Sequence, residues 1–407
     1  MSSTLEGDPR VIVEQRGVRG LLAAYRRRMA EGDIGQLPVI VGLIAIWAVF
    51  QYASDGIFLS AFNLVNLSIQ MAAVGTISVG VVLILLLGEI DLSVGILSGM
   101  CAAVMAVLAV NMDVAAPLAV AGGVLTGTVV GLFQGFWITR FGIPSFVVTL
   151  AGLIGWQGAL LHVLGRTGTI NLNDRFIIGL AGTFFKGPIA YVLAALFIAY
   201  VVAAPLLTHV RRQAAGLTVP PIAFAALRAI VVSVLVVVAV FALSADRGIG
   251  SGLVFLVGLV VVMDYILRRT RFGRMIYAIG GNAEAARRAG IPVQRVRMIV
   301  FVLASTMAAW GGMLGASRLR AVNQSAGQGD VLLNAIAAAV IGGTSLFGGR
   351  GSVWSALLGI IVIQSISNGM DLLSLRPSIK FMITGAVLLT AVTIDATLRR
   401  GRQASGR

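Results

Sequence analysis

The stretch RRTRFGRMIYAIGGNAEAARRAGIPVQRVR, residues 268–297, is the longest polar interruption in a sequence that is otherwise mostly apolar. It contains eight arginines and one acidic residue, Glu284. An apolar run of a length suited to crossing a bilayer lies on each side of it. The stretch is therefore predicted to connect two membrane spans on the side of the bilayer where positive charge collects.

A short helix is predicted inside this stretch. Asn282 is a preferred capping residue, residues 283–289 are mostly strong helix formers, and Gly290 ends the helix. Glu284 in the first turn and Arg287–Arg288 near the end both suit the helix dipole. Seven residues form a rod of about 10 Å, which is too short to be a domain but fits a groove on a partner.

This short helix has two interpretations. A solvated basic loop that follows the positive-inside rule would explain the arginines. It would not explain a capped and terminated helix rich in alanine, so we favour a docking helix. Its predicted functional residues are Asn282, Glu284, Ala285, Ala286, Arg287, Arg288 and Gly290.

The composition of the chain defines its class. Hydrophobic residues make up 58% of the 407 residues, charged residues make up 12%, and the mean hydropathy is +0.97. A soluble core cannot use so much apolar surface, so we predict an all-α integral membrane protein.

Twelve apolar runs outline the expected bundle. They are residues 37–54, 63–87, 94–111, 115–138, 144–165, 188–207, 225–243, 248–267, 298–316, 332–343, 351–370 and 378–397. Because 332–343 is short and ends in glycine, it is a candidate half-helix or re-entrant segment, and we expect ten to twelve crossings. In one of these runs, Gly123, Gly127, Gly131 and Gly135 recur every four residues, which we interpret as ordinary helix packing.

The runs form a single transmembrane domain, 37–397, between two polar tails, 1–36 and 398–407. In the first tail, residues 11–29 are weakly amphipathic and are a candidate interfacial helix. If all runs cross and the N-terminus is cytoplasmic, 23 of the 31 Lys and Arg residues lie on the cytoplasmic side. This excess predicts that both termini and the docking stretch are cytoplasmic.

The sequence argues against several other classes of protein. The net charge of +15 is confined to loops and tails, so we reject nucleic acid as a partner and expect lipid. The single cysteine, Cys101, and two separated histidines offer no metal site and no cofactor site. No acid–base cluster and no phosphate-binding G-x-x-x-x-G-K-[ST] motif is present, so we predict that this chain is not an enzyme. If ATP drives it, another chain binds the nucleotide.

The segment GEIDLSVG, residues 88–95, joins two apolar runs with almost no loop. Each buried acid costs about 2.5–3.5 kcal/mol on an insertion scale, so Glu89 and Asp91 need a structural or functional reason. One interpretation is a tight turn at the membrane surface in which Asp91 or Ser93 caps the next helix. The other is a broken helix that lines a pathway. The sequence leaves both open.

The segment GGTSLFGGRG, residues 342–351, has the same character in the second half of the chain. Five glycines in ten residues cannot form regular helix throughout, and irregular backbone at membrane depth is tolerated only beside a cavity or protein. The candidate pathway or broken-helix residues are Glu89, Asp91, Ser93, Gly342, Gly343, Thr344 and Ser345.

These motifs resemble a known family. Residues 284–290 resemble the EAA signature of ABC importer permeases, although the usual distal Leu-Pro is absent. Four ordered motifs resemble the monosaccharide branch of these permeases, which includes ribose, galactose and xylose systems. They are GEIDLSVG (88–95), PSFVVTLAG (144–152), GRMIYAIGGNAEAARRAGI (273–291) and AIAAAVIGGTSLFGG (335–349).

Within that branch the chain resembles xylose permeases most, because Glu89 replaces a commoner glycine and RRQAAGL (211–217) precedes an extra apolar run. The resemblance implies a homodimer in the bacterial inner membrane. It also implies a periplasmic sugar-binding protein and a cytoplasmic ATPase that holds ATP-Mg. The docking helix would transmit the ATPase movement, and D-xylose would be imported by alternating access.

Two other kinds of function compete with this expectation. A permease of the same family for ribose, galactose or a nucleoside would carry the same motifs. A secondary transporter driven by protons or sodium would explain Glu89 and Asp91, and dependence on ATP separates it from an ABC importer.

Overall fold

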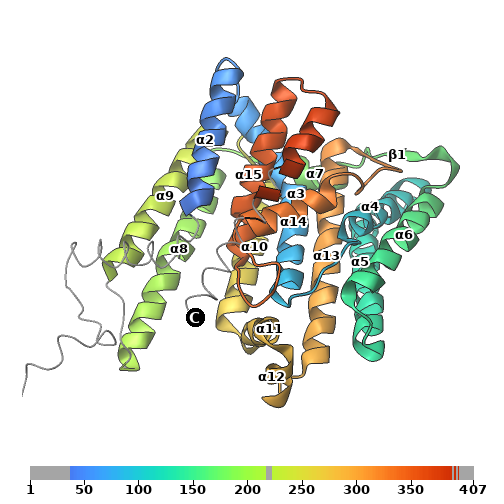
Figure 1. The fold of residues 1–407 in the computed structure, drawn as a ribbon. Helices are drawn as coiled ribbons and strands as arrows, with labels where there is room; N and C mark the ends of the chain where they lie inside the picture. The colour runs from blue at the N-terminus through green and yellow to red at the C-terminus, as the bar shows by residue number, and fades with distance from the viewer. Residues whose placement is uncertain (1–36, 217–221, 387–388, 391–392, 394–407) are drawn as a thin grey trace, which may run out of the picture.

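The computed structural model describes residues 37–216, 222–386, 389–390 and 393 (Figure 1). The expected interfacial segment 11–29, Leu217 and the C-terminal tail 398–407 lie outside these residues, as does part of the last apolar run. Within the described part, nine helices are long and apolar enough to cross a membrane, and two apolar helices are shorter. The predicted all-α polytopic membrane fold is therefore confirmed.

Each described apolar run forms a helix at the expected place. The helices are α2 (Leu37–Ala53), α3 (Ala61–Leu86), α4 (Val94–Ala106), α5 (Ala116–Phe141), α6 (Ser145–Leu164), α7 (Arg175–Gly182), α8 (Pro188–Ala214), α9 (Ile222–Ser244), α10 (Ser251–Arg269), α11 (Arg271–Gly281), α12 (Ala283–Arg288), α13 (Val293–Leu319), α14 (Val331–Ile341) and α15 (Val353–Leu372). A π-helical turn, Val107–Asn111, extends α4, a 3-10 turn, Gly165–Thr167, follows α6, and the chain is helical again from Pro377.

Helices α3 and α13 form the centre of the bundle. The most apolar part of α3 is 78% buried, and α13 packs against α3, α4 and α5. The glycine stripe of α5 makes this packing close. A Cβ atom at Gly127 or Gly131 would lie 2.7 Å from an atom of α13, so only glycine lets the two backbones approach. The stripe is thus confirmed as a packing feature.

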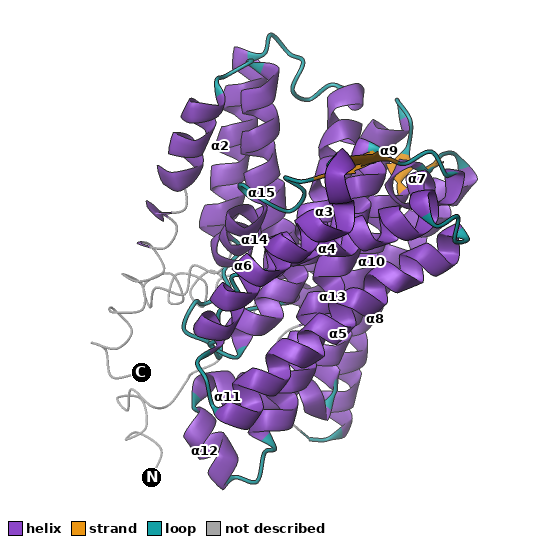
Figure 2. Ribbon diagram, turned by 90° about the vertical axis from the view of Figure 1, so that its right-hand side faces the viewer, coloured by secondary structure: helices purple, strands orange, loops and turns teal. Residues whose placement is uncertain are grey.

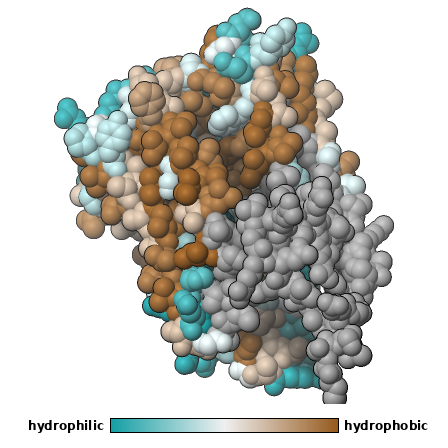
Figure 3. Space-filling view, turned by 90° about the vertical axis from the view of Figure 1, so that its left-hand side faces the viewer, coloured by the Kyte–Doolittle hydropathy of each residue, from teal (hydrophilic) through white to brown (hydrophobic). Residues whose placement is uncertain are grey.

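Helices α8 and α9 form a hairpin on the flank of the bundle (Figure 1). Their most apolar windows are only 11% and 17% buried. Figure 3 shows the face on this side as a broad hydrophobic area with hydrophilic residues gathered at the two ends. Such a surface matches hydrocarbon in its middle and water at its ends.

Two short antiparallel strand pairs lie at the end of the bundle opposite α12 (Figures 1 and 2). Strand β1 (Thr169–Asn171) pairs with β4 (Ala321–Asn323), with Ile170 opposite Val322. Strand β2 (Phe184–Phe185) pairs with β3 (Ile249–Gly250). These pairs satisfy backbone groups where long helices end, and they fix β4 at this end just before α14 begins.

Helix α14 is the half-helix that the sequence predicted at 332–343. Its 11 residues span about 16 Å, roughly half of a hydrocarbon core. The hydroxyl of Ser78 on α3 donates to the carbonyl of Ala335 at 2.9 Å. Because Ser78 lies eight residues, or about 12 Å, before the end of α3, α14 begins inside the bundle and not at its surface.

Candidate functional site

Helix α12 forms as the sequence predicted. The side-chain oxygen of Asn282 accepts a hydrogen bond from the backbone N–H of Ala285 at 2.9 Å, and Gly290 has φ +80°. The carboxylate of Glu284 pairs with Arg287 at 3.3 Å and with Arg288 at 3.4 Å. All three of these side chains are more than half exposed, while Ala286 is buried against the protein. The helix therefore presents a charged outer face at one end of the bundle (Figure 1).

Helix α11 was missed by the sequence analysis, which assigned residues 271–281 only to a polar connection. Thr270 caps it by accepting from the N–H of Gly273 at 3.2 Å. Ile276 and Ile279 are buried, so this helix lies flat on the bundle with one apolar face. The sequence signal was an apolar residue at each of 272, 275, 276 and 279, which the density of arginines obscured.

The first helix break spans residues 87–93, between α3 and α4. One carboxylate oxygen of Asp91, Oδ1, accepts hydrogen bonds from the N–H and the hydroxyl of Ser93 at 2.8 and 2.7 Å. Gln134 on α5 donates to the Ser93 hydroxyl oxygen at 2.7 Å. Asp91 is only 4% exposed, its second oxygen has no partner, and burial raises the pKa of this carboxyl group. Asp91 organises the turn before α4, whereas the side chain of Ser93 makes no capping hydrogen bond to that helix. A role of this break in lining a pathway stays a prediction.

Glu89 lies in the same break and pairs with Arg297 of α13 at 2.9 Å, with the two side chains 14% and 25% exposed. Two hydroxyl groups of α6 also hold the break. Ser145 accepts from the N–H of Ile90 at 3.3 Å, and Thr149 accepts from the N–H of Leu92 at 3.1 Å. The first break is therefore tied to α5, α6 and α13 by side chains.

The second break spans residues 342–352, between α14 and α15. It folds on itself, since the N–H of Ser345 donates to the carbonyl of Arg350 at 3.0 Å. Gly343 has φ +104°, a backbone conformation that side chains disfavour. Thr344 is 1% exposed, and its hydroxyl oxygen is buried without a partner.

The two breaks and α11 meet at one point. The N–H of Gly349 in the second break donates to the carbonyl of Leu86 at the end of α3, at 2.9 Å. A Cβ atom at Gly280 of α11 would lie within 3.0 Å of both Leu86 and Gly349. One at Gly348 would lie within 3.0 Å of both Gly280 and Gly88. We call Gly88, Gly280, Gly348 and Gly349 the glycine junction; it allows three backbones to touch.

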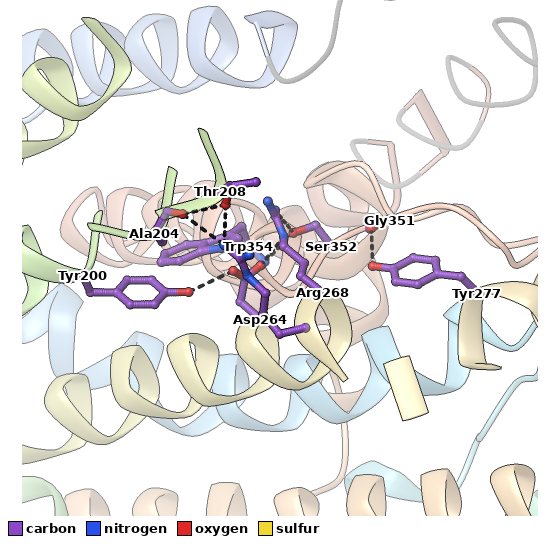
Figure 4. A network of polar contacts seen from close by, with 10 residues as sticks. Tyr200, Ala204, Thr208, Asp264, Arg268, Tyr277, Gly351, Ser352 and Trp354 are labelled. Carbon is purple, nitrogen blue, oxygen red and sulfur yellow. Dashed lines mark hydrogen bonds and ion pairs between the residues drawn. The ribbon is translucent and has the colours of Figure 1, made fainter. Parts of the chain in front are cut away.

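A polar network continues from this junction along α10 and α8 (Figure 4). The hydroxyl of Tyr277 on α11 donates to the carbonyl of Gly351 at 3.0 Å, and burial raises the pKa of this phenol, which keeps it a donor. Asp264 on α10 pairs with Arg268 at 2.6 Å and accepts from the hydroxyl of Tyr200 on α8 at 3.0 Å. Arg268 also reaches the Ser352 hydroxyl at 3.5 Å.

The predicted residues therefore fall into two groups that α11 connects. The docking residues 282–290 lie on the outside, and the break residues lie inward from them, next to the glycine junction. Sequence reasoning missed Gly280, Tyr277 and Arg297. The adjacent pair Gly280-Gly281 was a visible signal, but only at Gly280 would an added Cβ atom meet another segment.

A bundle of membrane-spanning helices with two internal breaks and an exposed capped helix at one end is the architecture of a membrane permease. Residues 63–392 match a family described as the permease component of branched-chain amino acid transport systems, and the chain belongs to this family. It is thus a multi-pass transport subunit.

Curated relatives refine this classification. The chain is 36% identical to the xylose transport system permease protein XylH of Escherichia coli (strain K12) over 362 residues, 89% of this chain and 92% of the relative. It is 33% identical to XylH of Haemophilus influenzae, over 89% of this chain and 96% of the relative. It is 29% identical to the ribose import permease protein RbsC of Bacillus subtilis (strain 168), over 92% and 97%. The resemblance to monosaccharide permeases is confirmed. The comparison with solved structures found no match.

Proposed function

We propose that this chain is the membrane permease of a bacterial ABC importer for a monosaccharide, D-xylose in the first instance. The observation that carries the proposal is the 36% identity to a xylose permease across 89% of the chain. The geometry agrees with it, since helix breaks inside the bundle lie next to an exposed helix of a size that docks on a partner.

The proposed assembly contains a homodimer of this chain in the inner membrane, with both termini in the cytoplasm. A periplasmic sugar-binding protein delivers the substrate, and a cytoplasmic ATPase holds ATP-Mg. This chain contributes α12, whose buried Ala286 fixes it to the bundle while Glu284, Arg287 and Arg288 face outward. These charges are available to complementary groups on the ATPase.

The proposed mechanism is alternating access driven by the ATPase. Closure of the ATPase domains moves α12 and, through it, α11. Because Gly280 and Tyr277 of α11 touch the second break and Gly280 also touches the end of α3, this movement reaches the interior of the bundle directly. The dimer then opens outward to receive sugar, and hydrolysis returns it to the inward state.

The substrate and the energy source are tested together in proteoliposomes that contain this chain, its ATPase and its binding protein. A panel of labelled monosaccharides is offered with and without ATP, and with an uncoupler. We expect xylose uptake that requires ATP and ignores the uncoupler. Preferential uptake of ribose or arabinose would keep the class of protein and change the sugar.

A second class of function is an ion-coupled transporter that uses a buried acid. The observation that favours it is the unpartnered oxygen of Asp91. Uptake that needs no ATP and is abolished by the uncoupler would establish it and refute the importer.

The role of α12 is tested by reversing charge on its outer face. Glu284→Lys should reduce both ATP-dependent uptake and stimulated ATPase activity. The double variant Glu284→Arg/Arg288→Glu restores an ion pair within the helix but inverts the outer charges, so it should stay defective if the charges contact the ATPase. Full recovery in the double variant would mean that only helix stability matters, and normal activity of both variants would refute the coupling role.

A further inference from the structure

A cavity lined by both apolar and polar residues lies where the half-helix α14 begins, between α14, α15 and the helical segment that starts at Pro377. Its volume is about 100 Å³, several times the space that one water molecule needs. The lining residues that carry chemistry are Asp330, Asn334, Ser367, Lys380, Phe381 and Thr384. No residue predicted from the sequence as functional lies in it.

The cavity lies within the bundle and away from α12. Strand β4, which precedes α14, is paired at the opposite end of the molecule, whereas Ala335 of α14 bonds to Ser78 partway along α3. Residues 324–330 therefore descend from that end to the start of α14. A Cβ atom added at Gly95 of α4 would lie 2.8 Å from the carbonyl oxygen of Gly327. This segment therefore packs closely against α4, which fixes its inward position. The cavity thus lies between the end that carries β4 and the second break.

Asn334 gives this cavity a recognition group. Its side chain is only 6% exposed, and its Nδ2 donates to Oδ2 of Asp330 at 2.9 Å. This bond identifies the other amide atom as the oxygen, and Oδ1 is buried without a hydrogen-bond partner. A buried carbonyl oxygen without a partner is unfavourable, so a ligand hydroxyl that donates to it would be favoured.

The other lining groups fit a neutral ligand with many hydroxyl groups. Lys380 is paired with Asp371, so its charge is balanced by an acid outside the lining. Ser367 and Thr384 supply hydroxyl groups that both donate and accept. Phe381 is 58% exposed and offers an apolar ring. Asp330 opposes binding of an anion, and its carboxylate can accept a hydrogen bond from a ligand hydroxyl.

We propose that this cavity is a binding site for the transported monosaccharide inside the membrane bundle, with Oδ1 of Asn334 accepting from a sugar hydroxyl. The proposal rests on the importer function proposed above. It assigns this permease a share of the sugar selectivity that would otherwise belong wholly to the binding protein. The bound sugar lies on the outer side of the second break, which then controls its passage inward.

Sugar contact is tested by thiol labelling in the complete complex. Ser367→Cys places a reactive group in the cavity with little change in volume, and the native Cys101 is buried. We expect saturating substrate sugar to slow the reaction of this cysteine with a hydrophilic thiol reagent about tenfold. The control is Ser325→Cys, whose exposed position in the 324–330 segment should react at the same rate with or without sugar. Equal protection of both, or of neither, would overturn the proposal.

Transport provides the second readout, through a matched pair of serines on α15. Ser367 lines the cavity, whereas Ser365, two residues away, accepts a hydrogen bond from Trp47 at 2.9 Å and lies outside the lining. Asn334→Leu should lower ATP-dependent uptake about tenfold, and Ser367→Ala should lower it by less, while Ser365→Ala leaves it unchanged.

The outcomes separate the two proposals. If the wild-type complex imports no monosaccharide with ATP, the importer function fails. If the wild type imports sugar while Asn334→Leu and Ser367→Ala keep its rate and its preference among sugars, only the cavity proposal fails.

Discussion

The two helix breaks differ in what holds them. Side chains from other helices hold the first break, through the Glu89–Arg297 ion pair and the hydrogen bonds of Ser93 and Thr149. The second break bonds to itself and to the carbonyl of Leu86, and Tyr277 of α11 donates to it. Gly280 of α11 touches the second break and the last residue of α3.

This difference indicates different roles. The first break belongs to the scaffold formed by α5, α6 and α13, so moving it would disrupt buried polar contacts in several helices. The second break is joined to α11, which continues into α12. We therefore expect the second break to follow α12 and the first break to stay in place.

The largest effect is expected at the glycine junction. Gly280→Ala would place a Cβ atom within 3.0 Å of the backbone of both α3 and the second break, and overpacking there should lower the free energy of unfolding by about 3 kcal/mol. Thermal unfolding in detergent measures the loss.

Its neighbour supplies the control. A Cβ atom at Gly281 meets nothing within 4 Å, so Gly281→Ala should leave stability unchanged or raise it slightly. Equal melting curves for the two variants would show that the junction is not close-packed.

The ion pair of the first break should have the next largest effect. Glu89→Gln leaves the largely buried Arg297 without its carboxylate and should cost about 2 kcal/mol of unfolding free energy. Glu89→Gln/Arg297→Gln removes both charges and should recover most of that loss in the same melting experiment. A single variant as stable as the wild type would show that the pair does not anchor the break.

Asp91 should show a smaller and pH-dependent effect. Because burial raises its pKa in the folded state, the wild type loses stability as the pH rises above the ordinary Asp value of 3.8 toward the raised value. Asp91→Asn keeps an acceptor for Ser93 and cannot ionise, so its stability relative to the wild type should increase across this interval.

Asp91→Ala distinguishes the effect of losing the hydrogen-bond acceptor from the effect of losing the negative charge. It removes the acceptor for both the N–H and the hydroxyl of Ser93 and should cost about 1.5 kcal/mol at low pH. Melting temperatures of the three proteins as a function of pH test this. If the stability advantage of Asp91→Asn over the wild type shrinks as the pH rises, the raised pKa of Asp91 in the folded state is contradicted.

The smallest effect on stability is expected from Tyr277→Phe. It removes one hydrogen bond to the second break, worth about 1 kcal/mol, and leaves the ring in place. Because this bond joins α11 to the second break, the variant should lower the amount of sugar imported per ATP hydrolysed more than it lowers the melting temperature. An unchanged ratio would show that Tyr277 only stabilises the fold.

The sequence predicted the features that depend on local chemistry. Apolar runs predicted the spans, because a bilayer requires about 20 apolar residues per crossing. Asn282 and Gly290 predicted α12, because capping and left-handed backbone are properties of single residues. The short run at 332–343 predicted the half-helix α14 for the same kind of reason.

The missed features depend on contacts between distant segments. Nothing near Arg297 in the sequence indicates that its partner is Glu89, more than two hundred residues earlier. Gly280 and Gly281 look alike in the sequence, and only packing against α3 distinguishes them. The cavity at Asn334 was missed because its lining comes from three separate segments.

The most direct test is a distance measurement by electron paramagnetic resonance in complexes where one protomer carries two spin labels. One label is placed at Arg287→Cys on α12. The second is placed either at Arg350→Cys in the second break or at Arg140→Cys at the end of α5, all of which are exposed sites. If the second break follows α12, the distance from Arg287→Cys to Arg350→Cys stays constant between the ATP-bound and nucleotide-free states. The distance from Arg287→Cys to Arg140→Cys changes between the same two states. A distance from α12 to the second break that changes as much as the distance from α12 to the end of α5 would contradict this account.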